Sequence, residues 1–253
     1  MALSTTPTKS SIRHDGAKHD EKAVHLTESL IEIETNPDIL SYLTAAEVDV
    51  LLKRGRETEY AKGEFFFRQG DPHEGIHFIR SGRVRSFYVS PAGREITLAY
   101  WPAGHFVGAP QIYGGGEHMW SSVAMEPSTG LWLPGRVLRG LIREIPNLAI
   151  GVIEGLVYKG RLYTALLQII GTRSMTMRLA HLLLTLADVD LASGNGAGEQ
   201  VDGFTQEELA NMIGATRQSV SVTMEKFEKD GLISREGQSM KLLNIPGLED
   251  ICF

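Results

Sequence analysis

Cysteine is almost absent from this chain of 253 residues, because the only one is Cys252, next to the C-terminus. One thiol cannot form a disulfide within the chain, ligate an iron–sulfur cluster through four thiolates or build a four-cysteine zinc site. No basic residue flanks this thiol in the sequence, so we expect it to be unreactive. The cysteine content favours a reducing compartment.

Long uninterrupted hydrophobic runs are also missing. The first 25 residues lack the apolar stretch of a signal peptide. The longest apolar region, residues 141–170, contains Arg143, Glu154 and Lys159 among its charges, which makes it costly to place in a bilayer. We therefore expect a cytoplasmic protein without a membrane partner. Basic residues are not in excess either: 25 against 31 acidic ones give a formal charge of −6, which by itself argues against a nucleic-acid partner.

The composition is that of an ordinary globular protein, with 42% hydrophobic residues, and the pattern of residue types changes along the chain. Residues 1–29 are expected to be a flexible extension. Residues 30–145 begin with helical spacing, capped at Thr44, and continue as short aromatic and β-branched runs separated by turn residues. Such runs predict an antiparallel sandwich or roll. The predicted strands are residues 65–67, 76–79, 84–89, 96–100, 121–124 and 130–133.

Helical periodicity follows over residues 146–171. Apolar residues recur every seven positions, which predicts a long helix with the seam of a parallel dimer; a helix packed only on its own domain is the alternative. The repeat consists of Ala149, Leu156, Tyr163 and Ile170. Gly151, Gly155 and Gly160 would allow a partner to approach closely. Gly171-Thr172 is expected to be a hinge before a second helix over residues 174–191.

The C-terminal residues 172–253 have the pattern of a DNA-binding unit. After a polar tract expected to be a loop, residues 192–202, Thr205 starts a helix with a capping-box pattern. Gly214-Ala215 turns the chain, and Thr216 caps a second helix that runs to about Lys229, followed by a hairpin wing over residues 231–243. Two short helices with a glycine turn predict a helix-turn-helix.

The second helix carries side chains suited to a DNA groove. Arg217 can bond to guanine in a bidentate manner, Gln218 can read adenine, and Ser219 can donate to a phosphate near the positive helix end. The predicted contact set is Thr205, Gln206, Thr216, Arg217, Gln218, Ser219, Ser221 and Lys226.

The order of a roll, a long helix and a winged helix-turn-helix resembles the CRP–FNR superfamily of bacterial transcription regulators over about residues 40–243. Residues 104–108, Gly-His-Phe-Val-Gly, are similar to the G-D-F-x-G entrance of that family's effector cassette, and residues 209–221 are similar to its helix-turn-helix. The resemblance implies an α+β fold with an N-terminal antiparallel β-roll of the cyclic-nucleotide-binding type, a dimerisation helix and a C-terminal winged helix-turn-helix. It also implies a homodimeric regulator without enzymatic activity, with a palindromic double-stranded operator and RNA polymerase as partners.

Departures from the family pattern concern the effector. Members that bind cyclic AMP have a glutamate after the last cassette glycine and an Arg-Ser pair for the phosphate; this chain has Ala109 and Met119-Trp120 there. Without the charged phosphate clamp we expect an apolar or aromatic effector instead of cyclic AMP. Its predicted site consists of Phe106, Gly108, Ala109, Ile112, Tyr113, His118, Met119, Trp120, Leu156 and Tyr163. In the recognition helix, Gln218 and Val222 replace a frequent acidic residue and a second arginine, which predicts a different operator half-site.

Two alternatives remain open. A haem-based gas sensor of the same family would use His77, His105 or His118 as an axial ligand. The other is a roll-shaped metalloenzyme whose C-terminal unit only mediates interactions, although the roll lacks a His-x-His pair with a downstream glutamate and histidine. Residues 73–77 also match the zinc-protease motif HExxH, but a strand-like run follows where that zinc site needs a helix.

The charge is unevenly distributed. Residues 173–253 hold seven basic and twelve acidic side chains, so the predicted DNA-binding part carries −5 of the −6. Non-specific attraction to phosphates should therefore be weak, and binding should depend on a few placed contacts.

Overall fold

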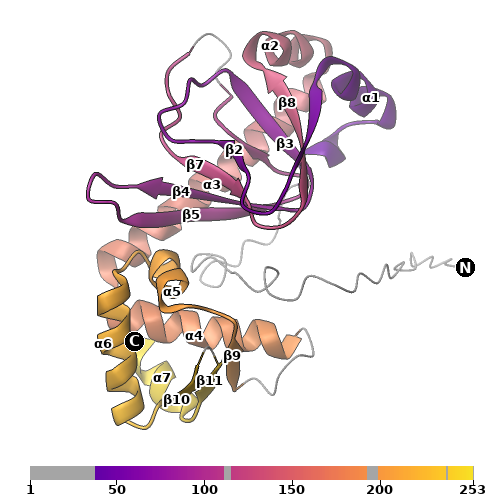
Figure 1. Cartoon of the computed structure of the whole chain (residues 1–253). Coiled ribbons are helices and arrows are strands. Elements are labelled where there is room, and N and C mark those ends of the chain that lie inside the picture. The colour runs from indigo at the N-terminus through magenta and orange to yellow at the C-terminus, as the bar shows by residue number, and fades with distance from the viewer. Residues whose placement is uncertain (1–37, 111–114, 193–198, 238, 253) are drawn as a thin grey trace, which may run out of the picture.

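The structure, a computed structural model, describes residues 38–110, 115–192, 199–237 and 239–252 (Figure 1). The predicted extension and the effector candidates Ile112 and Tyr113 lie outside the described residues. The described part begins with a short 3₁₀ helix, η1 (Ile39–Tyr42), and helix α1 (Ala45–Arg54). Helix α1 starts at the predicted cap, because the Thr44 side chain accepts from the Glu47 amide and the Glu47 carboxylate accepts from the Thr44 amide.

Eight strands then form two antiparallel four-stranded sheets, in the orders β1-β8-β3-β6 and β2-β7-β4-β5. The predicted roll within an α+β fold is thereby confirmed, with every predicted strand present. The strands are β1 (Arg56–Tyr60), β2 (Phe65–Phe67), β3 (Gly75–Ser81), β4 (Arg83–Val89), β5 (Glu95–Pro102), β6 (Phe106–Val107), β7 (Ser121–Ala124) and β8 (Ser128–Pro134).

The core between the sheets includes a buried polar link. The Trp101 Nε1 atom donates to the Ser86 hydroxyl at 2.9 Å, and the Ser86 hydroxyl lies 2.8 Å from that of Ser122. Because all three side chains are buried, these bonds satisfy groups that would otherwise be costly in the core. They join β4, β5 and β7 and fix how these strands pair.

Two helices follow the roll. Helix α2 (Gly135–Glu144) covers its end, and α3 (Pro146–Thr172) is the predicted long helix. One face of α3 packs on the roll through residues that include Val152, Leu162 and Leu166, all buried. The opposite face leaves Ile153 and Leu167 57% and 73% exposed. Helix α3 therefore packs on its own domain and also presents an apolar face to solvent.

The glycines of α3 do not all serve a partner helix. A Cβ atom at Gly155 would lie 2.6 Å from Cδ1 of Ile39 and 2.9 Å from Cε1 of Phe106, and one at Gly151 would lie 2.9 Å from Cγ2 of Ile39. The expectation that these two glycines admit a partner is wrong, because η1 of the same chain occupies the space. Gly160 has nothing within 4 Å of a Cβ position, so it stays open to a partner.

The C-terminal part has its own core beneath a helix-turn-helix. Its elements are α4 (Met175–Ala192), β9 (Gln200–Asp202), α5 (Gln206–Ile213), α6 (Arg217–Lys229), β10 (Ile233–Glu236), β11 (Ser239–Leu242) and α7 (Ile245–Cys252). The predicted helices and hairpin wing are present, but β9 falls in the tract predicted as a loop and pairs with β11. Cys252 is buried in α7, where its Sγ donates to the Leu248 carbonyl and burial raises the pKa of the thiol.

None of the helices in the described ranges has the length and apolar character needed to cross a membrane.

We expect Gly155→Ala to lower the free energy of unfolding by about 1–3 kcal/mol, because the new methyl group meets Ile39 and Phe106 in a packed core. Denaturant unfolding checks this. Gly140→Ala in α2 is the matched control: it has nothing within 4 Å of the new Cβ, so it should raise the free energy of unfolding by about 0.5–1 kcal/mol. Equal effects of the two substitutions would contradict the packing described for α3.

Candidate DNA-binding surface and effector site

The helix-turn-helix is set by local capping. Thr205 and Glu208 form a reciprocal capping box that starts α5, and Gly214 ends α5 in the left-handed region at φ 63°. The Thr216 side chain then accepts from the Ser219 amide at 3.1 Å and starts α6. Hydrogen bonds between residues close in sequence therefore determine the turn between the helices. This is why its position could be predicted from the sequence.

A buried arginine from α4 holds this turn in place. Arg178 is 9% exposed; its Nε donates to the Ile213 carbonyl and its Nη1 to the Arg173 carbonyl, each at 2.9 Å. Ile213 is the last residue of α5, and Arg173 follows the last residue of α3. One guanidinium thus connects the end of the long helix to the turn before α6. Sequence reasoning missed it, because an arginine in a helix gives no indication that it is buried.

Helix α6 has one buried and one exposed face. Its buried residues, Val220, Thr223, Met224 and Phe227, pack on the C-terminal core. The exposed residues of the other face include Arg217, Gln218, Val222, Glu225 and Lys226.

A hollow of about 250 Å³ brings predicted DNA contacts together. Thr205 and Gln206 of α5 and Arg217 of α6 line it beside Arg235 of β10. Arg235 forms an ion pair with Glu228 of α6, which fixes the wing against the recognition helix. The bond lowers the pKa of Glu228 and raises that of Arg235. The surface therefore combines two helix starts and the wing hairpin, with Arg217 exposed among them.

Several hydroxyl groups of the predicted DNA contacts already have hydrogen-bond partners in the chain. The hydroxyls of Thr216 and Ser219 lie 2.8 Å apart, the Thr205 hydroxyl donates to Glu208, and Ser221 lies 3.4 Å from the Glu225 carboxylate. Arg217, Gln218 and Lys226 are exposed. The latter three are the better-placed contacts in this conformation.

The predicted effector residues are only partly gathered. Phe106, Gly108 and His118 are buried in the roll, and the Ala109 amide donates to Nε2 of His73 at 2.8 Å. The rings of Trp120 and Tyr163 pack at the edge of the core that contains Trp101. Met119 is 74% exposed and Leu156 lies on the outward face of α3, 43% exposed, so the structure does not place these two in the roll interior.

Lys159 is a site residue that sequence reasoning missed. It lies on the inward face of α3, 9% exposed, where its Nζ donates to the Phe106 carbonyl at 2.9 Å and lies 3.3 Å from the centre of the Trp101 ring. Burial lowers the pKa of Lys159 to about 7, and among the described residues no carboxylate offsets this shift. The heptad spacing could have indicated that Lys159 is buried, because it lies seven residues from both Val152 and Leu166, which belong to the buried face of α3.

The three candidate haem ligands are surrounded by other rings. His118 stacks on Phe67 with 3.7 Å between ring centroids, His105 lies 5.3 Å from Tyr158, and Nδ1 of His77 is 3.4 Å from the Tyr60 hydroxyl. Burial lowers the pKa of His77 and His105 to about 3 and that of His118 to about 4. The three rings are therefore neutral and lie among other aromatic rings.

The HExxH match does not form a zinc site. Gly75 and His77 belong to strand β3, so the two histidines lack the helical spacing that the zinc-binding motif requires. The described residues contain no group of three or more His, Cys, Asp or Glu side chains placed to hold a metal ion.

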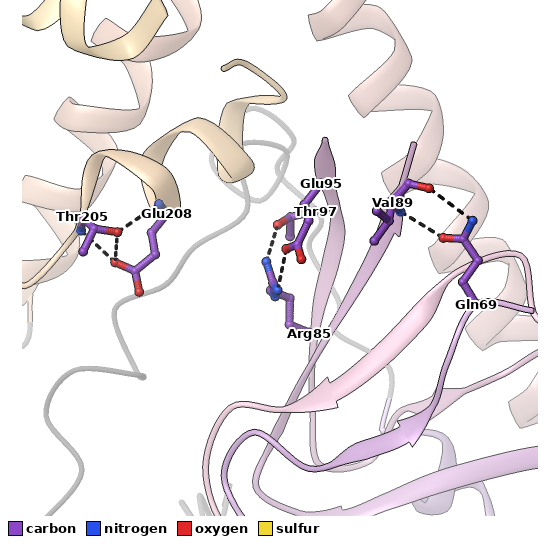
Figure 2. A network of polar contacts seen from close by, with 7 residues as sticks. All are labelled: Gln69, Arg85, Val89, Glu95, Thr97, Thr205 and Glu208. Atoms are coloured by element: carbon purple, nitrogen blue, oxygen red, sulfur yellow. Dashed lines mark hydrogen bonds and ion pairs between the residues drawn. The ribbon is translucent and has the colours of Figure 1, made fainter. Parts of the chain in front are cut away.

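The roll and the C-terminal part meet along β5. Tyr100 is buried in the core of the C-terminal part, and a cavity of about 480 Å³ lies between Arg85 and Tyr100 on one side and Glu208 and Met212 on the other. Figure 2 shows that polar groups near it are paired within each part: Arg85 lies 3.0 Å from Glu95, and Glu208 caps Thr205.

Comparisons with known proteins agree with this architecture. Residues 57–144 match the cyclic nucleotide-binding domain model and residues 177–251 match the Crp-like helix-turn-helix domain model, which together span more than half of the chain. The chain is 27% identical to the transcriptional activator protein anr of Pseudomonas aeruginosa, over 78% of this chain and 80% of that protein. It is 28% identical to the cyclic AMP receptor protein of Thermus thermophilus, over 83% and 94%. A crystal structure of a crp/fnr-family regulator from Eubacterium rectale superposes with a TM-score of 0.67 at 20% identity, covering 85% of this chain and 97% of that one.

We expect the stability of the protein to rise with pH between about 7 and 10.5 through Lys159, because in this window the unfolded chain holds a proton that the folded state has released. Lys159→Met removes this contribution, so between pH 7 and 9.5 the wild type should gain roughly 3 kcal/mol relative to the variant. Denaturant unfolding at both pH values measures it. Lys226→Met, at an exposed lysine of α6, is the control and should keep the wild-type rise. Parallel pH profiles of wild type and Lys159→Met would show that the amine is not buried as described.

Proposed function

Because the chain belongs to the CRP/FNR family of transcription regulators, we propose that it acts in the cytoplasm as a homodimer that binds a palindromic operator. A small effector in the β-roll controls this binding, and RNA polymerase is the partner through which transcription changes. The proteins that the chain matches are transcription regulators. The chain is likewise a regulator and not an enzyme.

The observation that carries the proposal is the exposed face of α6. A helix presented by a preceding helix and a wing, with Arg217 and Gln218 exposed in its first turn, has the arrangement with which helix-turn-helix proteins enter the major groove. Arg217 would contact guanine and Gln218 adenine. The hollow beside Arg217 places Gln206 and Arg235 at the same surface, where phosphates flank a groove.

The outward face of α3 supports the dimer. Ile153, Leu156, Val157 and Leu167 are each more than 40% exposed, and Gly160 lies among them with nothing near it. A continuous apolar stripe of this kind on an otherwise amphipathic helix is stabilised when a second copy covers it. Two recognition helices would then lie one helical turn of DNA apart, about 34 Å.

The effector is proposed to be neither cyclic AMP nor an iron–sulfur cluster. Ala109 and the Met119-Trp120 pair supply no charged side chain for a ribose or a cyclic phosphate. One cysteine cannot supply four thiolates. The aromatic rings of Trp101 and Phe106, whose centres lie 3.3 and 4.7 Å from Nζ of Lys159, support an apolar or aromatic effector.

Strand β5 supports a route from the effector to the DNA-binding part. Trp101 faces the roll interior, where its ring contacts the Lys159 amine, while the adjacent Tyr100 is buried in the C-terminal core. Successive residues of a strand point to opposite faces. If an effector shifts β5 or α3, the shift would therefore change the position of α5, because α5 contacts β5.

We expect Arg217→Ala to weaken operator binding by about 1–3 kcal/mol and to relax specificity at one base position in each half-site. Quantitative gel retardation on the upstream region of the gene, followed by single-base variants of the bound site, measures both effects. Arg217→Lys, which keeps the charge but not the bidentate geometry, should retain non-specific affinity and lose the base preference. Uniform weakening across all sequences would mean that Arg217 contacts only phosphate.

We expect a carboxylate in the exposed stripe of α3 to dissociate the dimer. Ile153→Glu combined with Leu167→Glu should convert a dimer to a folded monomer, because it places charge in a desolvated apolar seam. Sedimentation velocity measures the mass, and circular dichroism confirms folding. Lys53→Glu makes the same kind of charge change at an exposed residue of another helix, α1, and should remain dimeric. A dimer that survives the double substitution would place the interface elsewhere.

A further inference from the structure

One apolar side chain interrupts the polar face of α6. Val222 is 59% exposed and lies four residues after Gln218, one helical turn along the same face. At about 100° per residue, Gln218 and Val222 point away from the buried stripe of Val220, Met224 and Phe227. Val222 therefore stands at the centre of the surface that α6 presents outward.

The fold gives no reason for a valine at this position. Valine is β-branched and forms helices less well than alanine, lysine or glutamine, so it weakens α6 slightly. With 59% of its surface exposed, it contributes little to the core. In the described ranges of the C-terminal part the large exposed hydrophobic side chains are Val222 and Leu243, whereas most of the others lie on α3, where a second copy would cover them.

The chemistry of a DNA groove explains the valine. Each base pair presents donors and acceptors at its major-groove edge, but only thymine presents a C5 methyl group. A valine has no hydrogen-bonding atom, so against a guanine, cytosine or adenine edge it would displace water without replacing the hydrogen bonds. Against a thymine methyl group it displaces no hydrogen-bonded water from that group, and the contact buries apolar surface of both partners.

We propose that Val222 reads one thymine in each operator half-site through its C5 methyl group, beside the base read by Gln218. Four residues advance a helix by about 6 Å, so this thymine lies one or two base pairs from the Gln218 contact. The inference rests on the proposed function, because it assumes that α6 enters the major groove.

The test uses the full chain and a duplex that it selects. Wild-type protein first enriches its preferred site from a random duplex library. Each thymine of the half-site is then replaced, symmetrically and one position at a time, by deoxyuridine, which lacks only the methyl group. We expect replacement at one position to weaken binding of the wild type about fourfold per half-site, and replacement at the other positions to have little effect.

Two variants assign that methyl group to Val222. Val222→Ala should bind the thymine and deoxyuridine duplexes equally at this position. Its melting temperature should equal or slightly exceed that of the wild type, because the side chain is exposed and alanine favours the helix. Gln218→Ala is the matched control on the same face: it should lose preference at a neighbouring base and keep the thymine discrimination.

Four results would overturn the inference, and they can be told apart. Deoxyuridine tolerated at every position would show that no methyl group is read. Discrimination retained by Val222→Ala, or a loss of affinity equal for all sequences, would assign Val222 to another contact. A library from which wild-type protein enriches no sequence, with or without candidate apolar or aromatic effectors, would contradict the proposed function itself.

Discussion

The close packing of α3 on its own domain is the constraint on which the rest of the structure depends. Gly151 and Gly155 let the helix approach Ile39, and the Lys159 amine bonds to the Phe106 carbonyl at the edge of the roll. This contact fixes which face of α3 is buried and therefore which face remains apolar and exposed. The position of the proposed dimer seam is thus a consequence of how the helix meets the roll. A displacement of Phe106 by an effector would act directly on this helix.

The buried amine makes this contact sensitive to what lies around it. An ammonium group in a desolvated site is costly unless an anion or several acceptors surround it, and Lys159 has one carbonyl and two aromatic rings. A negatively charged or polar group placed next to the Lys159 ammonium would therefore stabilise it. The same Trp101 ring belongs to β5, which packs on α5 through its neighbour Tyr100. The interior of the roll and the core of the C-terminal part are therefore separated by the thickness of one strand.

Short-range patterns explain what the sequence predicted well. Caps at Thr44, Thr205 and Thr216 and the turn at Gly214 depend on neighbouring residues, and they were located to the residue. Strand β1 was missed because its sequence, Arg-Glu-Thr-Glu-Tyr, is mostly polar, as befits a strand at the edge of its sheet. The burial of Lys159 and Arg178 was missed because it is decided by distant parts of the chain. Gly155 was assigned to a partner for the same reason, since only the tertiary fold places Ile39 beside it.

The acidic charge of the DNA-binding part, seven basic against twelve acidic residues, has a consequence for how the protein is distributed in a cell. Every genome offers some 10⁶–10⁹ non-operator sites that compete for a regulator, and their hold is almost entirely electrostatic. A regulator that these sites retain weakly stays largely in free solution. The fraction of operator that it occupies then depends directly on the concentration of dimer able to bind DNA, because little of the protein is bound to other sites on the chromosome. For the proposed effector-controlled dimer, a small number of molecules would then be sufficient, and a change in effector concentration would reach the operator without a large pool of DNA-bound protein to redistribute.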